Sequence, residues 1–345
     1  MNVRSIKVRV KPAFGAAIAS GAKDFLAVAA ENTKKVLIVS DDTVCKLYGQ
    51  AVKKSLGKED LTVYTFVYSA TENGKTKYIL DKLLILMTEL DLDKDDLVVA
   101  LGGGTAFSLA GFACSVFKGG VPYVNVPTTL FAMGGSCING EVGVDFLGRE
   151  NLLSAVRYPK AVFCDTEFIK TLEHDPYSHG MAEIIRLALV GDRRVFDMMS
   201  TVDFTIEEGI CCALKIKAAE KSEFPFSVFR TKNTNFGEPF IKAVRVVSHY
   251  LATEGEALAL GVLIAAEVSE ALGECVGIAA RITEVYDRLG VKYDVGVKIQ
   301  DVIDYVFKND KVKKDGIELL LIKQAGSCVV RKLDYAALSE VELGR

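Results

Sequence analysis

The chain lacks a surplus of positive charge. Its 345 residues include 42 Lys and Arg against 45 Asp and Glu, which gives a formal net charge of −3. There is no long basic run and no interleaving of basic with aromatic residues. Because binding to a phosphate backbone requires clustered cations, we expect no nucleic-acid partner.

Long apolar runs are also absent. The richest stretch, residues 257–268, is flanked by Glu256 and Glu270 and is shorter than the roughly 20 residues that a membrane helix needs. It predicts a buried helix. The first residues alternate apolar and basic side chains, as a strand does, and lack the apolar centre of a signal peptide. We therefore expect a cytoplasmic protein with no membrane partner.

Cysteines in C-x-x-C pairs are missing. The eight cysteines are scattered, and the only close pair is the adjacent Cys211 and Cys212. Cysteine behaves as a small hydrophobic residue in reducing compartments. This pattern predicts reduced, buried thiols rather than disulfides.

The chain does have enough hydrophobic residues, half of the total, to build two cores of ordinary domain size. In the first half, β-rich runs alternate with helical ones, which predicts a Rossmann-like α/β domain with a mostly parallel sheet. The β-rich runs are residues 35–39, 61–64, 96–101, 121–126 and 161–164.

From about residue 166 the helical period dominates, at residues 181–190, 209–221 and 257–272. We expect an α/β domain over residues 1–165 and an all-α domain over residues 166–345. A cleft between two such domains is the default place for a ligand.

Three glycines, Gly102 to Gly104, follow a predicted strand and precede a predicted helix. Glycines in such a turn let backbone N–H groups approach a phosphate, and the helix N-terminus adds favourable partial charge. Asp41, Thr128 and Thr129 also follow strands, so they are expected at the same carboxyl edge. A simple tight turn and helix N-caps are the alternative explanations of these residues.

Taken in order, several segments resemble the 3-dehydroquinate synthase family of sugar-phosphate cyclases. The matching segments are VSD at 39–41, LGGGTAFSLAGF at 101–112, VPYVNVPTTL at 121–130, PKAVFCDT at 159–166, GMAEIIR at 180–186, NFGEPF at 235–240, EGEALALG at 254–261 and NDKVKKDG at 309–316. The resemblance implies an NAD-binding α/β domain, a helical domain that carries a divalent metal, and a homodimer.

The resemblance also implies which residues bind NAD. The positions that match are Asp41, Glu72, Lys75, Gly103, Gly104, Thr128 and Thr129. One departure is Ser108, where the family's glycine loop normally has an aspartate.

The metal positions depart further. Where the family has one glutamate and two histidines, this chain has Glu183, Glu238 and Glu254. Three carboxylates suit Mg²⁺ or Mn²⁺ better than Zn²⁺. Alternatively, Lys242, one helical turn after Glu238, supplies the balancing charge and makes a metal unnecessary.

A purely structural explanation fits the same glutamates. Glu238 precedes Pro239 at a helix start, and Glu254 lies beside a capping box formed by Thr253 and Glu256. His249 is expected to be a surface or packed residue rather than a replacement ligand.

The positions that bind the family's anionic substrate have changed as well. Family lysines align with Glu141 and Glu150, a family arginine with Gly119, and a family aspartate with Gly135. Two like charges about 4 Å apart near a protein surface repel by roughly 4 kcal/mol. The substrate-binding residues that the resemblance still implies are Lys217, Asn235, Lys242, Asn151 and Arg186.

Three functions therefore remain possible, and the third is that of proteins with a related fold. The first is a lyase that cyclises a sugar phosphate with transient use of NAD and loss of phosphate, as in the shikimate pathway. The second is an NAD-binding homologue that has lost this activity or takes a non-phosphorylated small molecule. The third is a dehydrogenase related to the glycerol and iron-dependent alcohol dehydrogenases.

Overall fold

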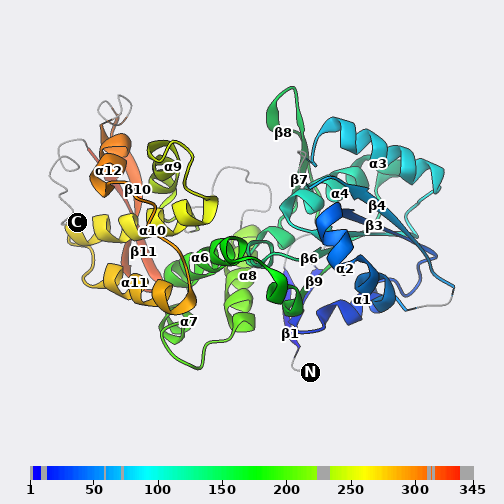
Figure 1. Ribbon diagram of the computed structural model, residues 1–345, viewed down its shortest axis with the longest axis horizontal. Coiled ribbons are helices and arrows are strands. Elements are labelled where there is room, and N and C mark those ends of the chain that lie inside the picture. The colour runs from blue at the N-terminus through cyan, green and yellow to red at the C-terminus, as the bar shows by residue number, and fades with distance from the viewer. Residues whose placement is uncertain are drawn as a thin grey trace. The chain divides into compact units, whose positions relative to one another are not determined.

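The computed structural model describes residues 3–8, 14–57, 60–70, 74–223, 234–308, 312 and 315–334. The chain forms two compact units (Figure 1). The first comprises residues 1–172 and 217–228, and the second residues 173–216 and 229–345. The first unit's initial segment ends at Leu172, seven residues after the boundary expected at residue 165. The two-domain division at residue 165 stays a prediction.

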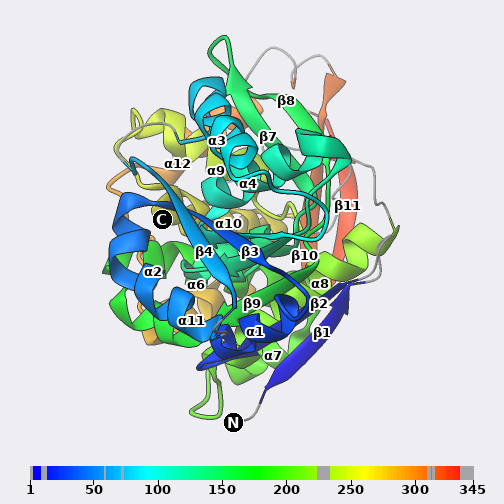
Figure 2. The ribbon, with the colours of Figure 1, turned by 90° about the vertical axis from the view of Figure 1, so that its right-hand side faces the viewer.

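A seven-stranded sheet forms the centre of the first unit, in the order β1-β2-β9-β6-β5-β3-β4. Figure 2 shows β1, β2, β9, β3 and β4 of this sheet. Only the β1–β2 pair is antiparallel. The strands are β1 (Arg4–Val8), β2 (Phe14–Ala19), β3 (Lys35–Asp41), β4 (Thr62–Tyr68), β5 (Leu97–Gly102), β6 (Tyr123–Pro127) and β9 (Ala161–Asp165). The five β-rich runs of the sequence are confirmed as strands, and so is the mostly parallel fold class.

Helices α2 (Asp42–Ser55), α3 (Lys77–Glu89) and α4 (Gly104–Val116) follow β3, β4 and β5. Helix α4 is buried along most of its length because it packs on β5 and also on β7 (Glu141–Phe146). Strand β7 forms an antiparallel hairpin with β8 (Arg149–Val156). The short helices α1 (Leu26–Ala29) and α5 (Leu130–Met133) complete the α-helices described in this unit.

The second unit is mainly helical. Helix α10 (Glu254–Ala271) is its buried centre and packs on α6 (His174–Gly191), α9 (Glu238–Val247) and α11 (Ile278–Leu289) (Figure 1). Its other described helices are α7 (Arg193–Met198), α8 (Ile206–Glu223), whose last turns belong to the first unit, and α12 (Ile299–Phe307).

One β hairpin shows that the prediction of an all-α second domain was wrong in this part of the chain. Strands β10 (Ile317–Gln324) and β11 (Ser327–Leu333) pair around a turn in which Gly326 has a φ of 79°. The Ile322 amide donates to the Ser269 hydroxyl on α10 at 3.1 Å, so the hairpin is joined to the core of the unit.

The eight cysteines are all free thiols, and six of them are buried, as the sequence predicts. No helix in the described ranges combines the length and apolar character needed to cross a bilayer.

Candidate functional site

The glycine turn brings together most of the predicted cofactor residues. Gly103 is the N-cap of α4, and a Cβ built on it would lie 3.9 Å from the Thr129 hydroxyl oxygen. A Cβ on Gly102, whose φ is 147°, would lie 3.6 Å from Asp41 Oδ2, and one on Gly104 3.9 Å from Ser136 Oγ. The polar groups of three separate loops therefore surround the N-terminus of α4, where backbone N–H groups favour an anion.

Asp41 and Thr129 also cap helices. Asp41 Oδ1 accepts a hydrogen bond from the Val44 amide at 2.8 Å at the start of α2. Thr129 Oγ1 accepts one from the Ala132 amide at 3.2 Å at the start of α5. The N-cap explanation of both residues is confirmed, and it leaves Asp41 Oδ2 on the side that faces Gly102.

Three buried hydroxyls near the turn have no hydrogen-bond partner in the part of the chain that the structure describes: Ser40, Thr128 and Ser136. Ser40 lies near the carboxyl end of β3, and the Thr128 amide donates to the Gly102 carbonyl at 3.0 Å. An unsatisfied buried polar group costs about 1–3 kcal/mol. The oxygens of a dinucleotide's phosphates and riboses are suitable partners, so these residues fit the cofactor that the resemblance implies.

Lys75 and Asn151 lie together on one side of the β7–β8 hairpin. Lys75 Nζ donates to Asn151 Oδ1 at 3.3 Å and lies 3.4 Å from Asp145 Oδ1. The backbone amide of Asn151 also donates to Asp145 Oδ1, at 2.8 Å. The sequence analysis missed Asp145, which balances the charge of Lys75. Glu72 lies outside the described residues.

Lys217 lies against Gly135. A Cβ on Gly135 would be 3.2 Å from Lys217 Cε and 3.3 Å from its Cγ, so the absence of a side chain at position 135 makes room for the lysine stem. Because Gly135 precedes Ser136, this contact places Lys217 next to the loop that faces the glycine turn. Asn235 is exposed in the turn before α9, and its carbonyl accepts from the Glu238 amide at 3.1 Å.

Each glutamate at a predicted metal position has its own cationic partner. Glu183 Oε2 lies 2.6 Å from Arg186 NH2, in a pair that is buried on α6. Glu238 Oε1 lies 3.1 Å from Lys242 Nζ, as the one-turn spacing predicts. Glu254 Oε1 accepts from Arg245 NH1 at 3.3 Å. Across the described residues, no group of three or more His, Cys, Asp or Glu side chains is arranged to hold a metal ion.

The histidine near these glutamates is His179, which the sequence analysis overlooked in favour of His249. His179 is one helical turn before Glu183 on α6, and a Cβ on Gly255 would lie 2.8 Å from its Cβ. Burial lowers the pKa of His179, and Arg186 adds to this, whereas Glu254 and Glu183 oppose it. His249 is exposed in the turn after α9. The spacing of four residues before Glu183 was the available sequence signal.

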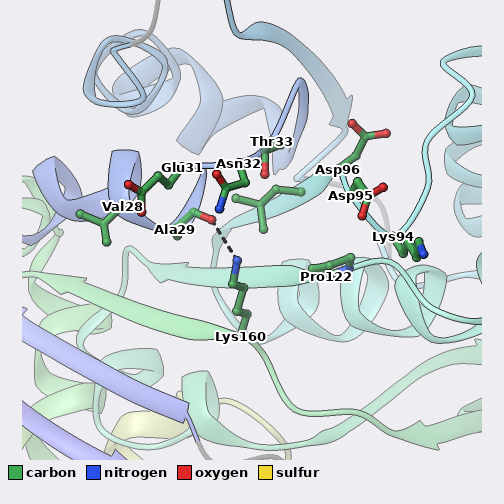
Figure 3. A pocket seen from close by; sticks show the side chains of 11 residues that line it. Val28, Ala29, Glu31, Asn32, Thr33, Lys94, Asp95, Asp96, Pro122 and Lys160 are labelled. Carbon is green, nitrogen blue, oxygen red and sulfur yellow. Dashed lines mark hydrogen bonds between the residues drawn. The ribbon is translucent and has the colours of Figure 1, made fainter.

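A cavity of about 310 Å³ lies at the opposite, amino-terminal end of the strands (Figure 3). Two of its polar side chains have structural partners: Lys160 Nζ donates to the Ala29 carbonyl at 3.2 Å, and Asp96 accepts from the backbone amides of Lys35 and Asp93, each at 3.1 Å. This cavity contains none of the predicted site residues.

Comparison with known proteins finds similarity to 3-dehydroquinate synthases and related cyclases. A family model described as "3-dehydroquinate synthase N-terminal" matches residues 65–179. The 3-dehydroquinate synthase of Clostridium tetani is 27% identical over 85% of this chain and 80% of its own length. The 2-epi-valiolone synthase of Actinosynnema mirum is 28% identical over 86% of this chain and 82% of its own.

Two solved structures show the same fold. A 2-deoxy-scyllo-inosose synthase complexed with carbaglucose-6-phosphate, NAD⁺ and Co²⁺ has a TM-score of 0.81 at 18% identity and covers 98% of both chains. The 2-epi-5-epi-valiolone synthase of Streptomyces hygroscopicus with NAD⁺ and Zn²⁺ has a TM-score of 0.76 at 21% identity and covers 94% of each.

The parallel sheet, its glycine turn and the helical second unit define the fold class as dehydroquinate synthase-like. Within that class, the chain is similar to the 3-dehydroquinate synthase family in its sequence as well.

Proposed function

We propose that this protein binds NAD at the carboxyl edge of its sheet and has lost the metal-dependent cyclisation of sugar phosphates. The observation that carries the proposal is the pairing of Glu183, Glu238 and Glu254 with three separate cations. NAD, when bound, would supply hydride transfer to or from a ring alcohol. The backbone at Gly103 and Gly104 would hold its pyrophosphate.

The side chains around the glycine turn would make the remaining contacts with NAD. Asp41 Oδ2 would accept from a ribose hydroxyl, because the other carboxylate oxygen already caps α2. Thr128, Thr129 and Ser136 would place hydroxyl groups beside the phosphates and the second ribose. These groups orient the cofactor, and none of them requires a metal.

Loss of metal chemistry follows from the charges of the pairs. A guanidinium or ammonium group about 4 Å from a carboxylate near a protein surface supplies roughly 4 kcal/mol of attraction, the role that a bound cation would otherwise have. A divalent ion at these glutamates would have to displace three such partners. Binding of a phosphorylated substrate is also disfavoured, because Glu141 and Glu150 stand where the resemblance implies lysines and Asp145 neutralises Lys75.

The test uses the whole chain. We expect isothermal titration calorimetry in the presence of EDTA to show NAD binding. We also expect no release of inorganic phosphate when the protein is incubated with NAD, a panel of divalent metals and the heptulosonate phosphate substrate of 3-dehydroquinate synthases. Phosphate release with any metal, or a failure to bind NAD, would refute the proposal.

A second candidate function is that of an active sugar-phosphate cyclase, a lyase. It is favoured by the identity of 27–29% to several 3-dehydroquinate synthases over at least 85% of the chain. In that case Lys217, Asn235, Asn151, Arg186 and Lys242 would position the substrate. Metal-dependent phosphate release in the same assay would establish this function. We also propose a homodimer, which light scattering tests.

A further inference from the structure

Two arginines beside the predicted metal positions have donors without acceptors. The Nε atoms of Arg186 and Arg245 are buried, and neither has a hydrogen-bond partner in the described portion of the chain. Arg186 as a whole is only 8% exposed. An unpaired buried N–H group is costly, because it has given up its bonds to water and gained none in return. Such a donor indicates a ligand with oxygen acceptors.

The two arginines belong to one cluster, which consists of His179, Glu183, Arg186, Arg245 and Glu254. Glu183 and Arg186 are one helical turn apart on α6, with His179 one turn earlier. Glu254 begins α10, whose next residue, Gly255, would place a Cβ 2.7 Å from the His179 Cα. Gly255 therefore brings the start of α10 directly against α6.

Arg245 is held in place from two sides. Its NH1 donates to Glu254 Oε1 at 3.3 Å, and the centre of its guanidinium group lies 5.6 Å from the centroid of the Tyr250 ring. Tyr250 is in the left-handed region with a φ of 62°, and the preceding residue, His249, has a φ of 53°. Two consecutive residues with positive φ are strained, so a defined turn orients the tyrosine over the arginine.

The cluster carries no net charge. Two guanidinium groups balance two carboxylates in its two ion pairs. An anionic ligand therefore gains little electrostatic attraction here. Guanidinium N–H donors beside carboxylate acceptors match vicinal hydroxyl groups, which accept and donate at once.

We propose that Arg186, Arg245, Glu183 and Glu254 form a metal-independent binding site for an uncharged polyol, meaning a sugar or cyclitol without phosphate. This inference rests on the proposed function and gives its ligand class. The third pair, Glu238 with Lys242, is balanced in the same way and adds no free positive charge.

The experiment compares uncharged polyols with their phosphate esters. Glucose and myo-inositol, and their monophosphates, are titrated in EDTA into the whole chain and into Arg186→Lys and Arg245→Lys, which keep the charge but lose the Nε–H donor. We expect an uncharged polyol to bind, its phosphate ester to bind no tighter, and each variant to weaken binding by about tenfold. The proposal fails if neither polyol binds, if an ester binds about tenfold tighter, or if both variants bind like the parent.

Arg331→Lys is the matched control. Arg331 also pairs with a glutamate, Glu274 at 2.8 Å, but on the β11 strand and outside the cluster. The Arg331→Lys variant should bind the polyol as tightly as the parent chain does. A loss of polyol affinity as large as in the cluster variants would contradict the assignment. NAD titration of every variant checks that the first unit is folded. If the parent chain does not bind NAD, the proposed function alone is refuted. If the parent chain binds NAD but neither polyol, this inference alone is refuted.

Discussion

The two units keep different shares of what the family resemblance implies. In the first, Asp41, Gly103, Gly104 and Thr129 surround one helix N-terminus. In the second, the three glutamates are distributed among three ion pairs. A site built from backbone N–H groups depends mainly on the turn, which tolerates many substitutions around it. A metal site depends on the identity of each ligand, so a few substitutions are enough to replace metal ligands with ion pairs.

The largest effect is expected from breaking the buried pair. Arg186→Met should lower the free energy of unfolding by about 3–5 kcal/mol, because it leaves Glu183 charged and buried without a partner. Arg245→Met should cost at most about 1 kcal/mol, since the Glu254 side chain is 71% exposed. Urea denaturation measures both. Equal losses would show that burial does not distinguish the two pairs.

The close approach of α10 to α6 gives the next effect. Gly255→Ala should destabilise the protein by about 1–3 kcal/mol, because its Cβ would meet the backbone of His179. Gly15→Ala is the control, since its Cβ would meet nothing closer than 3.9 Å. Thermal unfolding followed by circular dichroism measures the difference. A Gly255→Ala variant as stable as the control would contradict the close contact.

Asp41 allows capping to be separated from cofactor binding. Asp41→Asn keeps an oxygen that caps α2 and should preserve stability, yet weaken NAD binding by about tenfold through loss of the charged acceptor. Asp41→Ala should lose about 1 kcal/mol of stability as well. Calorimetric titration with NAD and urea denaturation of both variants provide the measurements. Unchanged NAD affinity in Asp41→Asn would remove this carboxylate from the cofactor site.

Acid should weaken the second unit through His179. Because burial lowers its pKa in the folded state, the unfolded chain binds the proton more readily. This contribution to stability is complete above the unfolded pKa of about 6.5 and is lost as the pH falls towards the lower folded value. Stability curves of the parent and of His179→Gln should therefore diverge below about pH 6.5. Parallel curves would contradict the shift.

The smallest effect is expected at the surface pair. Lys242→Ala should change stability by no more than about 0.5 kcal/mol, because the Lys242 side chain is 73% exposed and the pair spans one turn of α9. Chemical denaturation in low and high salt tests this. A larger, salt-insensitive loss would indicate that the pair is buried in a contact beyond α9.

The fold was predictable from the sequence where one local pattern dominates. Strands buried on both faces, such as β5, are continuous apolar runs, and the capping box at Thr253 and Glu256 is confirmed as predicted. The Glu238–Lys242 pair could be predicted because it obeys the helical period. The β10–β11 hairpin was missed, although Gly326 between two β-rich runs is the typical signal.

The partners of the glutamates were harder to foresee. Arg245 and Glu254 are on different helices, joined through a turn, so no periodic spacing links them. Asp145 meets Lys75 only because the β7–β8 hairpin folds back on the start of α3. Arg186 was assigned to substrate from the resemblance, and its ion pair with Glu183 depends on burial that sequence spacing does not report. Tertiary packing decides such contacts.

The first compact unit includes residues 217–228, which the ribosome makes after residues 173–216 of the second. The first unit therefore cannot be complete when its sheet has been synthesised, because it also needs the last turns of α8. Lys217, whose stem lies beside Gly135, belongs to this later segment. A fragment cut after Leu172 would lack this piece, so the two units cannot be expressed as two separate continuous fragments, because the chain passes between them three times.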